Sequence, residues 1–213
     1  MMQKAEILPA EFPTLLFEKH LWKNGFSHIA GIDEAGRGAL AGPVCAAVVI
    51  LPEQVRLTRT LKGVRDSKQM TPEERERWAP RIQTTAIAWG VGFASAADID
   101  DLGIIPATKL ASRRAIDSLI LTPEALLTDA LLFPDLELPQ IALIKGDQRS
   151  LSVAAASVLA KTARDALMRE SEAKYPGYGF ARHKGYGTQA HRAAVQRLGL
   201  CPIHRQSFTI RYP

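Results

Sequence analysis

The pattern of apolar and polar positions predicts three strands in the first half of the chain. Residues 28–33 (HIAGID) form a short apolar run that ends in a carboxylate, and residues 43–52 (PVCAAVVILP) are apolar almost throughout. An unbroken, β-branched apolar run of this length is typical of a strand that is buried on both faces. Residues 84–94 (TTAIAWGVGFA) predict a third strand.

Helices are predicted from their start and stop signals. The clearest start is TPEERERWAPRIQ, in which Thr71 is a candidate N-cap, Pro72 occupies the first turn and Glu74 completes a capping box. Four other segments follow: residues 95–103 behind the N-cap Ser95, residues 105–120, residues 152–175, and residues 188–199, which begin at Thr188 and stop at Gly199.

Two more strands are predicted later, over residues 124–133 (EALLTDALLF) and 139–147 (PQIALIKGD). Three strands followed by helix, strand, strand and helix predict an α/β protein with a mixed sheet, and 213 residues fit a single domain. Residues 175–187 (YPGYGFARHKGYG) form a loop rich in glycine and aromatic residues between the last two helices.

Charge and cysteine usage narrow the class of protein. The formal net charge of +5 and the pI near 9.4 favour a polyanionic partner, although many basic proteins bind nothing acidic. Cys45 and Cys201 lack a metal-binding spacing, so we expect reduced cysteines and a cytoplasmic protein. The N-terminal segment MMQKAEILPAEFP does not resemble a signal sequence, and no uncharged stretch is long enough for a bilayer, so no membrane partner is expected.

Asp33 and Glu34 are adjacent carboxylates between an apolar run and the turn Gly-Arg-Gly. Side chains alternate along a strand, so these two can converge only at its carboxyl end, where open α/β sheets bind ligands. Two carboxylates about 4 Å apart repel by about 4 kcal/mol at an effective dielectric near 20, and a divalent cation reverses the sign. The alternative is that both simply cap a turn in water, and these two residues alone do not decide.

Two further acids favour a functional site. Asp129 lies inside an otherwise apolar predicted strand, and Asp147 ends the last one. Burying an unpaired charge is expensive, so an aspartate in an apolar strand requires a partner. Acids on three strands suit a hard cation such as Mg²⁺ or Mn²⁺, with water filling the remaining positions, whereas no His/Cys spacing suits zinc.

The same glycine turn also matches a dinucleotide-binding fingerprint. Gly36, Gly38 and Ala41 fit G-x-G-x-x-A behind a strand. That motif requires a helix to open at the glycines, but Pro43 and a strand-like run follow almost at once. The adjacent carboxylates would also repel the bound anion, so we disfavour this interpretation.

The chain resembles bacterial ribonuclease HII in six segments, which run in order from about residue 29 to residue 208: GIDEAGRGALAGPV, DSKQMTPEERE, ATKLASRRAI, IKGDQRSLSVAAASVLAKTARD, HKGYGT and PIHRQSF. The resemblance implies a ribonuclease H-like fold with a five-stranded mixed sheet flanked by helices and a helical C-terminal part. One catalytic domain would span residues 1–213, with residues 176–213 contacting the substrate.

The resemblance also implies an activity and a set of site residues. The family cleaves RNA in RNA/DNA hybrids and cuts 5′ of a ribonucleotide embedded in duplex DNA, leaving 3′-hydroxyl and 5′-phosphate ends. Its four acidic ligands for Mn²⁺ or Mg²⁺, with two ions during catalysis, match Asp33, Glu34, Asp129 and Asp147. Its motif for sensing the ribose 2′-hydroxyl matches Gly36, Arg37 and Gly38, and its sugar-packing tyrosine matches Tyr186.

Basic residues are expected to hold substrate phosphates, although each could instead be a solvated surface charge. The candidates are Lys68, Lys109, Arg113, His183, Lys184, His204 and Arg205. Asp165 follows Lys161 by four residues, so we expect a helix-face ion pair and not a metal ligand.

Two positions depart from the family pattern. Ala130 stands where relatives commonly have glycine after the third acid, which makes Asp129 the least secure ligand. Gly103 stands where relatives usually have asparagine before the helix that contains ATKL.

The sequence therefore favours a metal-dependent endoribonuclease that acts as a monomer. Two alternatives stay open at this point: a non-catalytic nucleic-acid-binding module, and another two-metal nuclease on the same fold. A pure binder would gain nothing from acids that repel phosphate at its centre.

Overall fold

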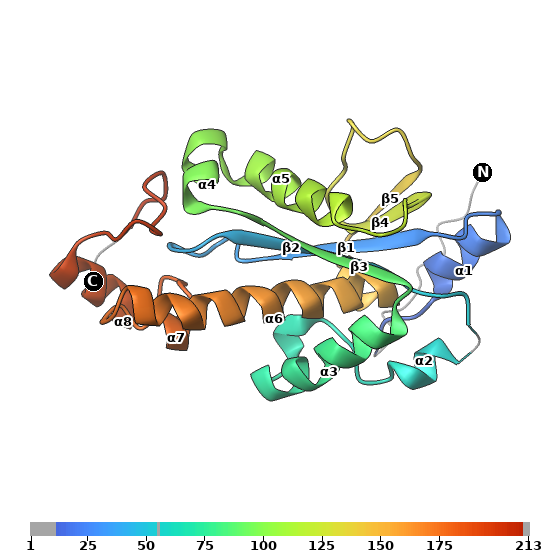
Figure 1. Cartoon of the computed structure of the whole chain (residues 1–213), viewed down its shortest axis with the longest axis horizontal. Coiled ribbons are helices and arrows are strands. Elements are labelled where there is room, and N and C mark those ends of the chain that lie inside the picture. Colours follow the sequence, from blue (N-terminus) through green and yellow to red (C-terminus); the bar gives the residue numbers. More distant parts are fainter. Residues whose placement is uncertain (1–11, 55, 211–213) are drawn as a thin grey trace.

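A computed structural model of the chain describes residues 12–54 and 56–210 (Figure 1). Most of the N-terminal segment considered above for targeting lies outside these residues. Five strands form one sheet in the order β3-β2-β1-β4-β5. Their bounds are β1 Ile29–Ala35, β2 Val44–Ile50, β3 Ala88–Ala94, β4 Ala125–Asp129 and β5 Gln140–Leu143. The prediction of a five-stranded mixed sheet is confirmed, because β1, β2 and β3 are antiparallel neighbours while β4 and β5 run parallel to β1.

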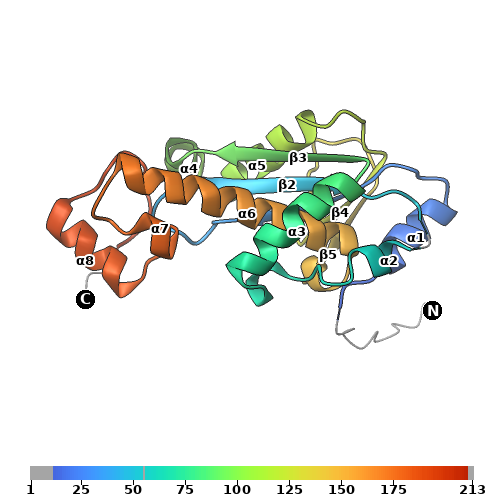
Figure 2. The same ribbon diagram turned by 60° about the horizontal axis from the view of Figure 1, so that its bottom comes forward.

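Helices cover both faces of this sheet (Figures 1 and 2). Helices α4 and α5 lie on one face, and α3 and α6 lie on the other, while α7 and α8 extend past one end of the sheet. The helices are α1 Leu16–Lys23, α2 Leu57–Thr60, α3 Pro72–Thr85, α4 Ala96–Leu102, α5 Ile104–Asp117, α6 Leu151–Lys174, α7 Phe180–His183 and α8 Gln189–Leu198. In the described part of the chain, none of them combines the length and the apolar character that a membrane span requires.

Local chemistry explains where these helices begin. Thr71 and Glu74 form the predicted capping box of α3, with Pro72 in the first turn. Ser95 caps α4 and Thr188 caps α8, also as predicted. Helices α1, α2 and α7 were not predicted, and α2 and α7 are short segments of four residues each.

The long helix α6 packs unusually close to β1. A Cβ at Gly31 would lie 2.3 Å from the backbone carbonyl carbon of Ser152, so only glycine permits this approach. The small side chains of residues 154–157 (AAAS) are buried in the same interface. This contact brings the N-terminal half of α6 next to the carboxyl ends of β1 and β4.

Two of the predicted strands end earlier than expected. Strand β4 ends at Asp129 because Ala130 takes the left-handed conformation (φ +59°), so Asp129 is its last residue and not an interior one. Strand β5 ends at Leu143, and Lys145 is again left-handed (φ +55°). The prediction that Asp147 ends a strand is therefore wrong. Asp147 lies instead in a short 3₁₀ helix, Gly146–Gln148.

Candidate active site

The four predicted acids come from three neighbouring segments at one end of the parallel strands. Ile32 of β1 pairs with Thr128 of β4, so Asp33 and Asp129 follow in adjacent register. The backbone N–H of Gly146 donates to Asp129 Oδ1 at 2.9 Å, which ties the turn that carries Asp147 to the end of β4. The fold thus brings together acids that are up to 114 residues apart in sequence.

Asp33 and Glu34 both lie inside β1, which continues to Ala35. The expectation that the strand would end between them is therefore wrong, and alternation sends the two side chains toward opposite faces. Asp33 shares the α6 face with Gly31, whereas Glu34 shares the α5 face with Ile32. Both can still reach one site, because β4 has ended beside them and leaves the sheet open there.

Burial and mutual repulsion raise the pKa values of three of these acids. Asp33 is buried, and burial together with the charge of Glu34 raises its pKa well above the ordinary value. Burial also raises the pKa of Glu34, although the ion pair with Arg37 at 3.0 Å opposes this. For Asp147, burial and the charges of Asp66 and Asp129 raise the pKa to about 6. The folded chain therefore concentrates negative charge at considerable cost.

Lys68 is the cation that faces this cluster. Its Nζ lies 3.8 Å from Asp147 Oδ2, and although burial alone would lower its pKa, the surrounding carboxylates raise it. Asp66, two residues earlier, is a further buried acid near this cluster, and the sequence did not define its role. It accepts from the Lys68 backbone N–H at 2.9 Å and from Gln148 Nε2 at 3.3 Å, and so it holds the turn that presents Lys68.

An open cavity of about 370 Å³ adjoins the acids. Its walls come from β1, from the glycine turn that follows it, from the turn at Lys68, from α6 and from the loop after α7. The lining includes Glu34, Gly36, Arg37, Gly38, Lys68, Asp129, Lys161 and Tyr186. Most of the residues predicted to contact metal or sugar therefore surround one hollow.

Hydrogen bonds from Arg205 hold the glycine turn that lines this cavity. This side chain is completely buried, and its Nε, Nη1 and Nη2 donate to the carbonyls of Gly42, Arg37 and Gly36 at 3.0, 2.8 and 2.7 Å. The prediction that Arg205 contacts phosphate is wrong for this geometry, because its donors are committed to the backbone of residues 36–42. Arg205 instead fixes the shape of the turn.

A second buried arginine, Arg164 of α6, was missed by the sequence analysis. It donates to the carbonyls of Pro43, Lys184 and Ala41 at 2.8, 2.9 and 3.1 Å. Gly36 has a φ of +93°, and a Cβ there would lie 1.9 Å from Arg164 Nε. The spacing from Ser157 and Ala160 puts Arg164 on the buried stripe of α6, which was the available signal.

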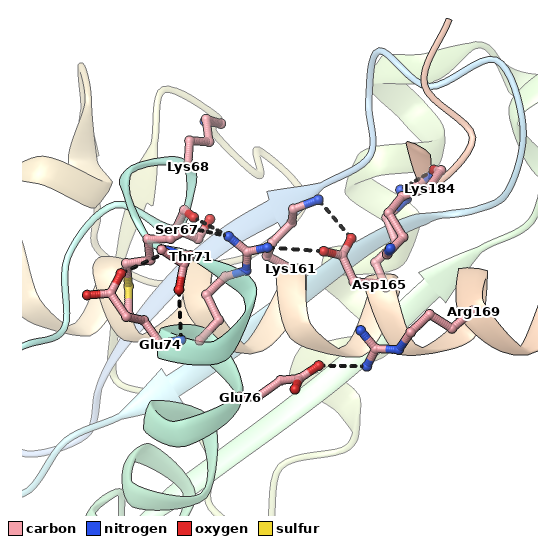
Figure 3. A network of polar contacts seen from close by, with 12 residues as sticks. Ser67, Lys68, Thr71, Glu74, Glu76, Lys161, Asp165, Arg169 and Lys184 are labelled. Carbon is pink, nitrogen blue, oxygen red and sulfur yellow. Dashed lines mark hydrogen bonds and ion pairs between the residues drawn. The ribbon is translucent and has the colours of Figure 1, made fainter. Parts of the chain in front are cut away.

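Tyr186 lies at the cavity beneath two cations. The Arg164 guanidinium carbon and Lys161 Nζ are each 5.4 Å from the centre of its ring. The expected pair of Lys161 with Asp165 is present at 2.7 Å, and buried Arg75 approaches the other oxygen of Asp165 at 3.3 Å. Figure 3 shows this network, in which the Lys161 ammonium points toward Asp165. The predicted ion pair of Asp165 with Lys161 is thus confirmed, and Arg75 is a second cationic partner that the sequence did not predict.

The other basic candidates lie apart from the cavity lining. His183 and His204 are buried and bond to backbone groups, so the prediction that they contact phosphate is wrong for this geometry. Arg113 of α5 pairs with Asp135, and Lys109 lies one turn before it on the same helix. Lys184 is half-buried, and its carbonyl accepts from Arg164. Phosphate contacts by Lys109, Arg113 and Lys184 stay predictions.

The donor set fits a hard divalent cation. Asp33 Oδ2 is buried and has no hydrogen-bond partner among the described residues, so one carboxylate oxygen is left without a counter-charge. Within residues 12–54 and 56–210, no three acidic, histidine or cysteine side chains already form a ready coordination shell. The carboxylates would therefore have to draw together around an ion, whose charge would offset the burial and mutual repulsion that raise their pKa values.

Comparison with known proteins agrees with this site. A sequence model of the family described as Ribonuclease HII matches residues 30–211. The chain belongs to the ribonuclease HII family. It is 51% identical to ribonuclease HII of Syntrophotalea carbinolica over 204 residues, which cover 95% of this chain and 96% of that relative. As a member of the ribonuclease HII family, the chain is an endonuclease that hydrolyses RNA in RNA/DNA hybrids.

Solved structures support the same fold. Ribonuclease H2 from Pyrococcus horikoshii OT3 is similar with a TM-score of 0.69 and 28% identity, covering 85% of this chain and 94% of that one. Bst-RNase HIII, solved in complex with Mn²⁺, is similar in fold, with a TM-score of 0.65 and 22% identity, covering 96% of this chain and 73% of that one. The predicted ribonuclease H-like fold is therefore confirmed.

Proposed function

We propose that this ribonuclease HII family member cuts the RNA strand of hybrids and also cuts duplex DNA on the 5′ side of an embedded ribonucleotide. The products would carry 3′-hydroxyl and 5′-phosphate ends. The observation that carries the proposal is the unpartnered carboxylate oxygen of Asp33, buried among further acids beside a cavity lined by Gly36–Gly38 and Tyr186. Carboxylates that could hold a metal ion and a glycine-rich backbone that could contact a sugar therefore lie beside the same cavity.

Asp33, Glu34, Asp129 and Asp147 would hold Mg²⁺ or Mn²⁺, with two ions during catalysis. Their mutual repulsion, the raised pKa values and the free Asp33 oxygen support this assignment. The Mn²⁺ complex of Bst-RNase HIII, a protein of the same fold, supports it as well. Two divalent ions would supply stabilisation of the charge on the attacking and leaving oxygens of the phosphodiester.

The chain's own residues would read the sugar. RNA differs from DNA at one site by its 2′-hydroxyl, which both donates and accepts hydrogen bonds. Gly38 is exposed, and a Cβ there would meet no heavy atom within 4 Å, so a nucleotide can approach the backbone closely. Arg37 is kept near the cavity by its pair with Glu34, and Tyr186 offers a flat ring to the adjoining sugar.

We also propose a domain span, a set of binding partners and a cellular location for the protein. One catalytic domain would span residues 1–213, with residues 176–213 contacting the substrate, as Tyr186 at the cavity suggests. The partners would be RNA/DNA hybrids and ribonucleotide-containing duplexes bound by a monomer, and the net charge of +5 supports a polyanionic partner. Two free cysteines, Cys45 and Cys201, support a reducing, cytoplasmic location.

A cleavage assay tests this function. Purified protein with Mg²⁺ or Mn²⁺ is given a duplex with one ribonucleotide, an RNA/DNA hybrid, an all-DNA duplex and single-stranded RNA. We expect cleavage of the first two only, on the 5′ side of the single ribonucleotide. Equal cleavage of the all-DNA duplex would contradict sugar reading by Gly36–Gly38.

The metal assignment has its own test. Free Mn²⁺ is titrated by electron paramagnetic resonance against the native chain, Asp33→Asn and the control Asp135→Asn. Asp135 is an exposed aspartate paired with Arg113, so its replacement removes the same charge away from the cluster. We expect only Asp33→Asn to weaken Mn²⁺ binding, and equal weakening in both variants would refute the assignment.

A further inference from the structure

Three histidines form a small buried core behind Tyr186. His183, His191 and His204 pack around the Phe180 ring, at 6.0, 5.5 and 5.6 Å between ring centres. All three are at most 9% exposed, although histidine is commonly found at protein surfaces and in catalytic clefts. The described residues give none of them a carboxylate partner, which directs attention to the hydrogen bonds that they make.

The hydrogen bonds of His204 and His191 form one chain whose direction is set at the Tyr186 end. The Cys201 backbone N–H donates toward His204 Nδ1 from 2.9 Å, but this nitrogen also lies 3.1 Å from Cys201 Sγ and 3.2 Å from the Cys201 carbonyl, so the Cys201 end alone does not place the proton. His204 Nε2 lies 3.1 Å from His191 Nε2, and His191 Nδ1 lies 3.0 Å from the Tyr186 carbonyl. A carbonyl can only accept, so the direction of the chain follows from this end.

The Tyr186 carbonyl sets the tautomers of two neutral rings. His191 carries its proton on Nδ1 and donates it to this carbonyl, which leaves His191 Nε2 as an acceptor. His204 must then carry its proton on Nε2 and donate it to His191 Nε2, so its Nδ1 accepts from the Cys201 N–H. A His204 proton on Nδ1 could be donated to the Cys201 carbonyl, but it would set the two bare Nε2 atoms of His204 and His191 against each other.

His183 is fixed in the same manner. Its Nδ1 accepts from the Gly185 N–H at 3.2 Å, so its Nε2 proton is donated to the Tyr178 carbonyl at 2.8 Å. Its ring stacks on His191 with 4.4 Å between centres. Burial and the neighbouring imidazoles lower the pKa of His191 to about 4, which agrees with a neutral ring.

The chain of hydrogen bonds ends at Tyr186, whose loop contacts the turn after β1, and both segments line the cavity. Tyr186 forms a backbone bridge with Ala39, and the Leu40 N–H donates to the Gly185 carbonyl at 2.8 Å. A shift of the Tyr186 backbone would therefore move both its ring and the Gly36–Gly38 turn. Buried hydrogen bonds that are lost on such a shift are costly, so the chain resists it.

We propose that His191 and His204 are positioning residues that hold Tyr186 in place for sugar recognition, through a directional hydrogen-bond chain that starts at Cys201. The inference rests on the proposed function of Tyr186. It assigns neither histidine a contact with the substrate. An apolar ring would fill the same volume, but it would leave the Cys201 N–H without its His204 acceptor and would remove one of the two donors of the Tyr186 carbonyl, which also accepts from the Thr188 N–H at 2.7 Å.

The tautomers can be observed directly in the native protein. Two-dimensional ¹⁵N–¹H spectra of the histidine rings at pH 7 should show neutral His191 with its proton on Nδ1, and neutral His183 and His204 with theirs on Nε2. A charged ring, or His204 protonated on Nδ1, would overturn the proposal. This measurement requires no variant to fold.

The functional test is a double-mutant cycle with single-turnover cleavage of the duplex that carries one ribonucleotide. His204→Asn keeps an acceptor for the Cys201 N–H but removes the link to His191. We expect its cleavage rate constant to fall about tenfold with substrate affinity little changed, and to fall no further when His204→Asn is added to Tyr186→Ala. Val195→Ala in the same small core is the control, since it lowers stability without touching the chain of hydrogen bonds.

The outcomes separate this inference from the proposed function. If Tyr186→Ala itself leaves cleavage unchanged, sugar packing by Tyr186 fails and the inference fails with it. If Tyr186→Ala slows cleavage but His204→Asn costs the same tenfold in both backgrounds, the proposed function stands and the inference is overturned. Slowing by Val195→Ala comparable with that by His204→Asn would also overturn it, because stability alone would then explain the loss.

Discussion

Replacing either glycine of the Gly-Arg-Gly turn by alanine should impair the protein, but for a different reason at each position. Gly36 is left-handed, and its added Cβ would lie 1.9 Å from Arg164 Nε. Gly38 is not left-handed and has open space around the added Cβ. Gly36→Ala therefore tests folding, whereas Gly38→Ala tests the approach of the substrate.

The cost of Gly36→Ala can be worked out from its contacts. A left-handed alanine costs about 1–2 kcal/mol. The methyl group also displaces the buried Arg164, and each hydrogen bond that such a charged group loses costs about 1.5–3 kcal/mol. A total of about 3 kcal/mol or more corresponds to a Tm lower by about 6–12 °C for a chain of this length. Gly38→Ala, at an exposed position, should change stability by no more than about 0.5 kcal/mol.

Thermal unfolding and cleavage of the single-ribonucleotide duplex are measured side by side for both variants. We expect Gly38→Ala to keep its Tm and to lose cleavage, with weaker discrimination against an all-DNA duplex, and Gly36→Ala to lose Tm. Two results would refute the reasoning: unchanged cleavage by Gly38→Ala, or a Tm for Gly36→Ala equal to that of the native chain.

Three further predictions concern stability and the anchoring of the turn. Ala130→Gly should stabilise the fold by about 0.5–1 kcal/mol, because it relieves the strain of a left-handed alanine (φ +59°) by more than it increases the conformational entropy of the unfolded chain. A lower Tm would contradict this. Because the folded state raises the pKa of Asp33, it binds that proton more tightly, so metal-free stability should fall as pH rises from about 4 toward neutrality. Asp33→Asn in EDTA should weaken this dependence and keep or raise the Tm at pH 7, and marked unfolding of the variant would instead make Asp33 structural. Arg205→Lys should slow cleavage while Mn²⁺ binding is retained, because the single nitrogen of lysine cannot reach the three carbonyls that three separate guanidinium nitrogens bond; parallel loss of Mn²⁺ binding would show that Arg205 supports the acids as well.

Most of the sheet followed from local pattern. The unbroken apolar run of residues 43–52 contains strand β2, which lies between β3 and β1, and Thr71, Ser95 and Thr188 cap helices where expected. The ends of β4 and β5 did not follow, because they depend on left-handed residues that are not glycine. Alanine and lysine give no local signal for that conformation, which tertiary contacts impose at Ala130 and Lys145.

The acidic residues of the candidate site were predictable from the sequence, but the buried residues that hold its loops in place were not. The acids and Tyr186 were proposed from motifs and from the family resemblance. Ala130 has a left-handed backbone (φ +59°), a conformation that favours glycine, which is the residue that the resemblance leads us to expect there. Gly103 likewise has a φ of +84° and a ψ of 161°, a combination open essentially to glycine alone. Arg205, His183 and His204 were misassigned, because the sequence gives their charge but not whether the folded chain buries them.

The hydrogen bonds of Arg205 to the turn at residues 36–42 link the first part of the candidate site to a residue that follows Gly36 by 169 positions. During synthesis the strand bearing Asp33 leaves the ribosome long before Arg205 does. A nascent chain could therefore assemble much of its sheet and still lack the rigid turn that distinguishes one sugar from another. Truncation just ahead of His204 should reproduce that state in a released protein, with acids present and discrimination absent.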